Sequence, residues 1–119
     1  MLVSDFIENG EYVRTKEGII GKVKTNFMEC EKMRLENDEV ISGRGIVKHS
    51  HNIIELIEVG DILLYKDGDV SKILNIENDY FLMSEHSTDS NYYLKKEITF
   101  SDIESIVTHE QIERIKYIV

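Results

Sequence analysis

Short runs of alternating hydrophobic and polar residues, separated by turns that contain glycine, predict a mainly β chain. The first run begins at Tyr12-Val13, turns at Lys16-Glu17-Gly18 and returns over residues 19–27. A tight hairpin needs a residue with positive φ, and Gly18 supplies it. We therefore expect a β-hairpin over residues 12–27.

The same pattern returns about 50 residues later, where residues 5–23 can be laid over residues 55–73 without a gap. Apart from six identical pairs, most of the aligned residues are conservative replacements, such as Glu11 with Asp61. Six residues, Ile7, Glu8, Gly10, Lys16, Gly18 and Lys22, recur identically as Ile57, Glu58, Gly60, Lys66, Gly68 and Lys72. Coincidence of a common hairpin pattern is the alternative explanation. The identities at one offset favour an internal repeat.

The second copy continues with an expected strand over residues 80–84, a polar loop at 86–91 and a strand over 92–98. A single helical turn at 100–103 and a closing strand at 104–107 follow. This order resembles an SH3-like barrel. We expect two tandem SH3-like small barrels, residues 1–54 and 55–119, or one continuous β-rich body built on the duplicated unit. Two packed units would share a core, whereas one of about 50 residues buries little surface alone.

Two stretches depart from the repeat. Residues 28–42 carry five carboxylates and two basic side chains, and predict either a short helix or a long hairpin. Near the C-terminus, Thr108 and Gln111 have the spacing of a capping box, which predicts a short helix after Thr108. Residues 116–119 then read as a final strand.

The charge balance limits the partners of the chain. Its 119 residues carry a formal net charge of −9, which argues against direct nucleic-acid binding. The single cysteine, Cys30, permits no internal disulfide, and the first residues lack the charged start and long apolar run of a secretory signal. No apolar run approaches the roughly 20 residues of a membrane span. We expect a cytoplasmic protein.

The acidity is also a functional clue. Residues 55–79 hold seven carboxylates against two lysines, and residues 29–40 add a local charge of −3. Such stretches can attract a basic partner, or can be an ordinary solvated surface that keeps a small protein soluble. As partner-binding residues we single out four acids and three tyrosines that could act as hot spots: Glu58, Asp61, Asp67, Asp69, Tyr65, Tyr92 and Tyr93.

Glycines and positive charge gather only around Ser42-Gly43-Arg44-Gly45 and the nearby Lys48. Flexible backbone amides beside an arginine can cradle a phosphate, although the spacing of a P-loop is absent. His49 and His51 would share one face of a strand, a spacing that can bind a transition metal. Alternatively, Ser50 and Asn52 cap a helical turn at Ile53-Ile54 and leave the histidines partly exposed.

Evidence for catalysis is thin. Cys30 lies between carboxylates that disfavour a thiolate, and no GxSxG, HExxH or paired CxxC motif occurs. We expect an interaction protein rather than an enzyme, with no cofactor and no bound metal.

Three segments carry a resemblance to a known group of proteins. Residues 103–112 with 117–119 resemble an ending of the form SIVTKEQF…Y-x-V, in which His109 and Ile112 replace the Lys and the Phe. Residues 12–22 match Y-[VI]-R-T-x-x-G-x-I-[GA]-K, and residues 52–61 match NIIDLIEVGD. In these three segments, the chain is similar to small proteins from phages, prophages and plasmids of Firmicutes.

That resemblance implies a mobile-element setting, in which small acidic proteins often block host defences, as anti-CRISPR inhibitors do. The leading hypothesis is an inhibitor, monomeric or homodimeric, whose acidic surface mimics nucleic acid and binds a host defence protein, such as a basic nucleic-acid-binding nuclease. The alternative is a small-ligand binder that sequesters a nucleotide signal through Arg44, Lys48, His49 and His51. A third hypothesis is a structural phage component.

Overall fold

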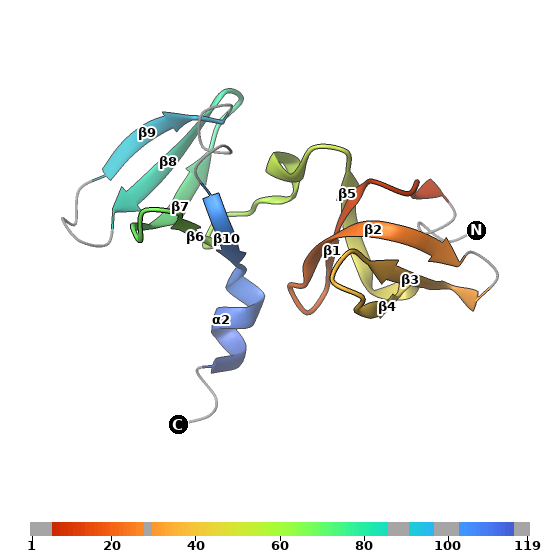
Figure 1. Cartoon of the computed structure of the whole chain (residues 1–119). Helices are drawn as coiled ribbons and strands as arrows, with labels where there is room; N and C mark the ends of the chain where they lie inside the picture. The colour runs from red at the N-terminus through yellow and green to blue at the C-terminus, as the bar shows by residue number, and fades with distance from the viewer. Residues whose placement is uncertain (1–5, 28–29, 86–90, 97–102, 116–119) are drawn as a thin grey trace. The chain divides into compact units, whose positions relative to one another are not determined.

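The computed structural model describes residues 6–27, 30–85, 91–96 and 103–115 (Figure 1). The chain divides into two compact units, Met1–Leu56 and Ile57–Val119, here called the first and the second unit. Each contains one five-stranded antiparallel sheet, and the second unit adds a short helix. The predicted mainly β class is therefore confirmed. Within the described residues, no helix has the length and the apolar composition needed to cross a bilayer.

The first unit is a meander of four strands whose fifth strand returns beside the first. The strand order across its sheet is β4-β3-β2-β1-β5. A 3-10 turn, η3 (Gly43–Gly45), precedes the fifth strand, and a second one, η4 (Ile53–Leu56), follows it. The strands are β1 (Tyr12–Thr15), β2 (Ile20–Phe27), β3 (Lys32–Leu35), β4 (Val40–Ser42) and β5 (Ile46–Ser50).

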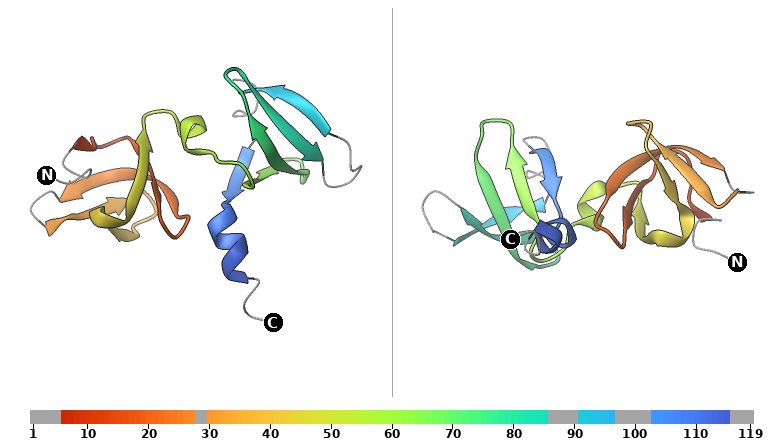
Figure 2. Two further views of the ribbon diagram at one scale, coloured as in Figure 1. Left: turned by 180° about the vertical axis from the view of Figure 1, so that it is seen from behind. Right: turned by 90° about the horizontal axis from the view of Figure 1, so that it is seen from below.

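The second unit has the same connectivity, and its strand order is β10-β6-β7-β8-β9 (Figure 2). Its last strand again pairs with its first, since Ile106 lies opposite Leu63. Helix α2 (His109–Ile115) follows that strand. The strands are β6 (Ile62–Tyr65), β7 (Val70–Ile76), β8 (Tyr80–Glu85), β9 (Asn91–Lys95) and β10 (Ile103–Val107).

The first hairpin of each unit has the predicted turn. Gly18 and Gly68 adopt φ of 87° and 94°, in the region that favours glycine. The backbone N–H of Thr15 donates to the carbonyl of Ile19, and that of Tyr65 donates to the carbonyl of Asp69, both at 2.9 Å. The two hairpins are thus closed by equivalent hydrogen bonds.

The acidic stretch at 28–42 was predicted to form either a short helix or a long hairpin. Its described residues, 30–42, form a hairpin. Strand β3 pairs with β4, and Met33 lies opposite Ile41. Alternate residues Met33 and Leu35 are buried, while their neighbours Lys32 and Arg34 are exposed. The period of two therefore separates a core face from a charged face.

Parts of the remaining predictions fall outside the described residues. Strand β9 ends at Lys95, whereas the sequence predicted a strand to residue 98. The predicted helical turn at 100–103 lies almost wholly in the undescribed segment 97–102, and Ile103 already belongs to β10. The predicted final strand at 116–119 is also outside the described residues.

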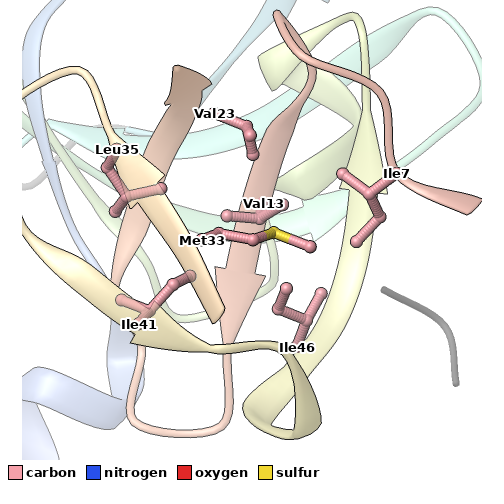
Figure 3. Close-up of a cluster of buried hydrophobic side chains, with 7 residues drawn as sticks. All are labelled: Ile7, Val13, Val23, Met33, Leu35, Ile41 and Ile46. Carbon is pink, nitrogen blue, oxygen red and sulfur yellow. The ribbon is translucent and has the colours of Figure 1, made fainter. Parts of the chain in front are cut away.

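Each unit has buried apolar side chains of its own. In the first unit, seven side chains from all five strands and the preceding segment point toward one another: Ile7, Val13, Val23, Met33, Leu35, Ile41 and Ile46 (Figure 3). In the second unit, the buried apolar residues include Ile57, Leu63, Ile73, Phe81 and Met83. Burying one such side chain stabilises a fold by about 1.5–3 kcal/mol relative to leaving it exposed.

An arginine is buried within the first unit. Arg14 on β1 is fully buried, and its Nη1 donates a 2.9 Å hydrogen bond to the carbonyl of Leu56 at the end of η4. A buried guanidinium needs such acceptors because its desolvation is costly. This bond ties η4 to the sheet.

Helix α2 begins as the capping box predicts. The side chain of Gln111 accepts a hydrogen bond from the backbone N–H of Thr108 at 3.1 Å. The N–H of Ile112 donates to the carbonyl of Thr108, also at 3.1 Å, and starts the helical ladder. The helix therefore starts at His109, immediately after the capping residue.

Candidate functional site

Both units open with the same four-residue turn, in which an acidic residue follows a glycine. In Glu8-Asn9-Gly10-Glu11, the carboxylate of Glu11 accepts a hydrogen bond from the backbone N–H of Glu8 at 2.6 Å. In Glu58-Val59-Gly60-Asp61, Asp61 accepts from the N–H of Glu58 at 2.8 Å. Both acids are buried. The fourth residue of each turn therefore holds the turn closed from inside the unit.

Asp61 was predicted to face a partner, and its burial contradicts that role. It has 0% exposure. Its second oxygen, Oδ1, accepts a hydrogen bond from the backbone N–H of His109 at 2.9 Å, so that the carboxylate joins the turn to the start of α2. An acid enclosed in this way cannot stand in for a phosphate on the surface. We correct the prediction: Asp61 is structural.

Glu58, His109 and Glu110 converge at the junction of this turn with α2. The ring Nε2 of His109 lies 2.8 Å from Oε1 of Glu58 and 3.0 Å from Oε1 of Glu110. The three side chains are 27%, 32% and 18% exposed in the order Glu58, His109, Glu110. One ligand atom from each lies within 4.8 Å of the others, close enough to hold one metal ion. Glu58, predicted as a surface acid, is thus engaged with a histidine.

No motif in the sequence predicted a site at His109 or Glu110. The repeat aligned only Glu58, with Glu8. In the structure, the first unit also places a histidine against that glutamate. His51 Nε2 lies 3.4 Å from Glu8 Oε2. Both of these side chains are largely exposed, however, and in that pair the histidine faces a single carboxylate.

His49 contacts the buried acid of the first unit. Its Nδ1 lies 2.9 Å from Oε1 of Glu11. Burial by itself raises the pKa of Glu11, but the hydrogen bonds from His49 and from the N–H of Glu8, with the charges of His49 and His51, outweigh it. The pKa of Glu11 is consequently held below its ordinary value of 4.5.

The residues between and after these histidines form the predicted cap. Oγ of Ser50 accepts a hydrogen bond from the N–H of Asn52 at 3.0 Å, and Oδ1 of Asn52 accepts one from the N–H of Ile54 at 3.2 Å. Asn52 therefore caps η4 as predicted, whereas Ser50 binds the backbone of Asn52, one residue before η4. Both histidines face carboxylates, which disfavours an anion beside them.

The predicted anion-binding residues are not gathered into one site. Arg44 lies in η3, before β5. His49 lies near the far end of that strand and His51 directly after it, and the exposed Lys48 precedes His49. Nε of Arg44 donates to Glu31 at 2.6 Å, and this hydrogen bond and the charge of Glu31 raise the pKa of Arg44. Arg44 is therefore already paired with an acid.

A hollow of about 230 Å³ lies beside Gly45. Among the described residues, its lining includes the carboxylates of Glu17 and Glu39 and contains no lysine or arginine. An anionic ligand would be repelled there. The geometry thus gives no support to a nucleotide site in this part of the first unit.

The other predicted acids lie on turns of the second unit. Asp67 and Asp69 are exposed in the turn between β6 and β7, where Oδ1 of Asp67 accepts from the N–H of Asp69 at 2.9 Å. Glu77 and Asp79 are exposed in the turn between β7 and β8, at the opposite end of β7. We call these two segments the acidic turns.

The three predicted tyrosines differ in exposure. Tyr65 and Tyr92 are partly buried, and their hydroxyls contact Met83 Sδ at 3.4 Å and Ser71 Oγ at 2.6 Å. Tyr93, on the edge strand β9 of the described sheet, is 59% exposed and lies opposite Leu82. Tyr80, which is not among the predicted partner-binding residues, is 39% exposed. Because side chains alternate along a strand, Tyr80, Leu82 and Tyr93 share the outer face, here called the tyrosine face.

Charge is unequally divided between the units. Residues 57–119 contain thirteen acidic and six basic residues, a net −7, whereas residues 1–56 contain ten and eight, a net −2. The second unit thus carries most of the formal charge of −9.

Comparison with protein-family models, with curated proteins and with solved structures finds no match.

Proposed function

We propose that the protein is a non-enzymatic interaction protein of a phage or other mobile element, and that its second unit binds and inhibits a basic host defence protein. The observation that carries this proposal is the concentration of charge in the second unit, a net −7 of the total −9. A field of one sign attracts a protein of the opposite sign and raises the rate of association.

The tyrosine face supplies the contact that charge alone does not. Tyrosine is enriched among the residues that dominate binding energy, because its ring buries a large area and its hydroxyl forms hydrogen bonds. Tyr93 and Tyr80 are exposed on one face of the sheet, and Glu77 and Asp79 lie in the turn directly before Tyr80. An aromatic centre with an acidic border suits a partner rich in arginine and lysine.

The architecture in this proposal is a pair of tandem SH3-like barrels. Two observations support it: both sheets have the same strand order, and the last strand of each pairs with the first. The equivalent turns at Gly18 and Gly68, and at Gly10 and Gly60, further support descent of both units from one duplicated segment.

The host-defence partner is inferred from the resemblance to proteins of mobile elements. Such a partner, for example a nuclease, presents a basic surface to nucleic acid. A protein that mimics nucleic acid occupies that surface, so the two ligands exclude each other. Binding should be stoichiometric and should weaken with salt, because ions screen exposed charges beyond about 10 Å at 0.1 M.

The test compares two variants of equal charge. The first neutralises exposed acids of the acidic turns and contains Asp67→Asn, Asp69→Asn and Asp79→Asn. The second neutralises three exposed acids in the β3–β4 turn of the first unit and contains Glu36→Gln, Asp38→Asn and Glu39→Gln. Asp61 is left intact in both, because its loss would disturb folding. Tagged proteins are used to capture partners from host lysate at low and high salt, and each captured partner is titrated for nucleic-acid binding.

We expect the acidic-turn variant and Tyr93→Ala to bind the partner more than about 10-fold more weakly, which corresponds to 1.4 kcal/mol. The β3–β4 variant should bind like the unchanged protein. If both charge variants lost the same affinity for the partner, the effect would come from net charge alone, which would contradict the assigned surface. A partner that binds nucleic acid and this protein at the same time would contradict mimicry.

A further inference from the structure

The contact between the Glu58-Val59-Gly60-Asp61 turn and the start of α2 brings two carboxylate oxygens close to one ring nitrogen. Two carboxylate oxygens, from Glu58 and Glu110, lie within 3.0 Å of one ring nitrogen, Nε2 of His109. That nitrogen carries at most one hydrogen, and its hydrogen bond is with Oε1 of Glu58. A divalent cation placed among the three atoms would instead interact with both carboxylates and the imidazole.

The backbone around these side chains is fixed by a residue that is not part of the cluster. Asp61 accepts hydrogen bonds from the backbone N–H groups of both Glu58 and His109, at 2.8 and 2.9 Å. Both side chains therefore project from backbone positions held by one buried carboxylate. Such outer contacts are what orient the ligands of metal sites in proteins.

Gly60 allows the turn and the helix to approach closely. A Cβ at this position would lie 3.2 Å from Cβ of His109, and the φ of Gly60 is 95°. At the equivalent Gly10 of the first unit, a Cβ would meet no atom of the described residues within 4 Å. The close approach of the histidine to the turn is thus particular to the second unit.

We propose that Glu58, His109 and Glu110 bind a divalent transition-metal ion of the Zn²⁺ class. One imidazole nitrogen and carboxylate oxygens are ordinary ligands for Zn²⁺, whereas Mg²⁺ and Ca²⁺ prefer oxygen alone. The two carboxylates balance the charge of the ion. All three side chains are partly exposed, so that water can complete the coordination. This site differs from the sequence-based expectation that the chain holds no metal, and it does not depend on the identity of the partner.

The first test is calorimetric titration of the metal-free full-length protein with Zn²⁺. We expect one ion per chain, with no comparable heat from Mg²⁺. His109→Ala should weaken binding by more than about 100-fold, because even the loss of an outer contact costs about 10–100-fold. The alanine keeps the Cβ beside Gly60 and the backbone N–H that Asp61 binds, so the unit should still fold. Glu110→Gln and Glu58→Gln should each weaken binding with little change in shape.

Three control variants separate this site from other Zn²⁺ ligands. Glu113→Gln changes an exposed acid on the same helix, His51→Ala removes the histidine of the first unit, and Cys30→Ser removes the exposed thiol. Each should bind Zn²⁺ like the unchanged protein. With Co²⁺ as a probe, the spectrum should show no sulfur-to-metal charge transfer. Absence of Zn²⁺ binding, binding that survives His109→Ala, or binding lost in His51→Ala or Cys30→Ser would overturn the proposal.

Discussion

Replacing Asp61 with asparagine should destabilise the second unit strongly, although the change looks conservative. Asp61 is fully buried, and its two oxygens accept hydrogen bonds from two backbone N–H groups. An asparagine keeps one accepting oxygen but presents an NH₂ group to the other N–H. A hydrogen bond to a charged group contributes about 1.5–3 kcal/mol, and an unsatisfied buried donor costs about 1–3 kcal/mol. We therefore expect a loss of about 3 kcal/mol.

That loss is large for a unit of this size. Native stability is roughly 0.05–0.15 kcal/mol per residue, which gives about 3–9 kcal/mol for residues 57–119. For a domain of about 60–100 residues, each kcal/mol lowers the melting temperature by roughly 4–8 °C. Asp61→Asn should thus lower the melting temperature of the second unit by more than about 10 °C.

Near-UV circular dichroism can follow the second unit selectively. The chain has no tryptophan, and five of its six tyrosines lie in residues 57–119. The matched control is Asp67→Asn, which alters an exposed acid and keeps the Oδ1 that accepts from the N–H of Asp69. Its effect should stay within about 0.5 kcal/mol. Similar melting temperatures for Asp61→Asn and Asp67→Asn would refute the assignment of Asp61 as a structural residue.

Two further predictions concern the opening turns. The folded pKa of Glu11 lies below 4.5, so its ionised form stabilises the first unit above that value, and this contribution is lost as the pH falls through the folded pKa. In urea unfolding followed by far-UV circular dichroism, Glu11→Gln should lower the free energy of unfolding near neutral pH. It should also make this free energy fall less steeply as the pH drops below 4.5. An unchanged pH profile would contradict this. Gly60→Ala and Gly10→Ala should both cost about 1–3 kcal/mol of backbone strain, but only Gly60→Ala should also displace His109 and weaken Zn²⁺ binding. Equal Zn²⁺ affinity in the two glycine variants would refute the close approach.

The elements that the sequence predicted well are those with local signals. The hairpin at Lys16-Glu17-Gly18 and the capping box from Thr108 to Gln111 depend on residues within a few positions of one another. The stretch 28–42 was ambiguous because its charged residues suit either a helix or a strand. Its hairpin follows from burial of Met33 and Leu35 in the core of the first unit, which the local sequence does not show.

The candidate sites were harder to predict because they depend on tertiary contacts. Asp61 reads as a surface acid, since aspartate is rarely buried, and only its pairing with Glu11 in the repeat hinted at a role in the turn. His109 lies 51 positions from Glu58, and pairing of β10 with β6 brings the two together. The sequence also does not reveal that the guanidinium of Arg44 donates a hydrogen bond to Glu31.

The acids that close the two opening turns differ in length by one methylene and have different hydrogen-bond partners. The longer Glu11 accepts from the N–H of Glu8 with one oxygen and reaches the ring of His49 with the other. The shorter Asp61 accepts from the N–H of Glu58 and, in place of a ring, from the backbone N–H of His109. Because that histidine is held by its backbone, its ring is available to Glu58 and Glu110. The turn that opens each unit thus places a histidine ring against its buried acid in the first unit. In the second unit it holds the backbone of a histidine whose ring lies against two carboxylates.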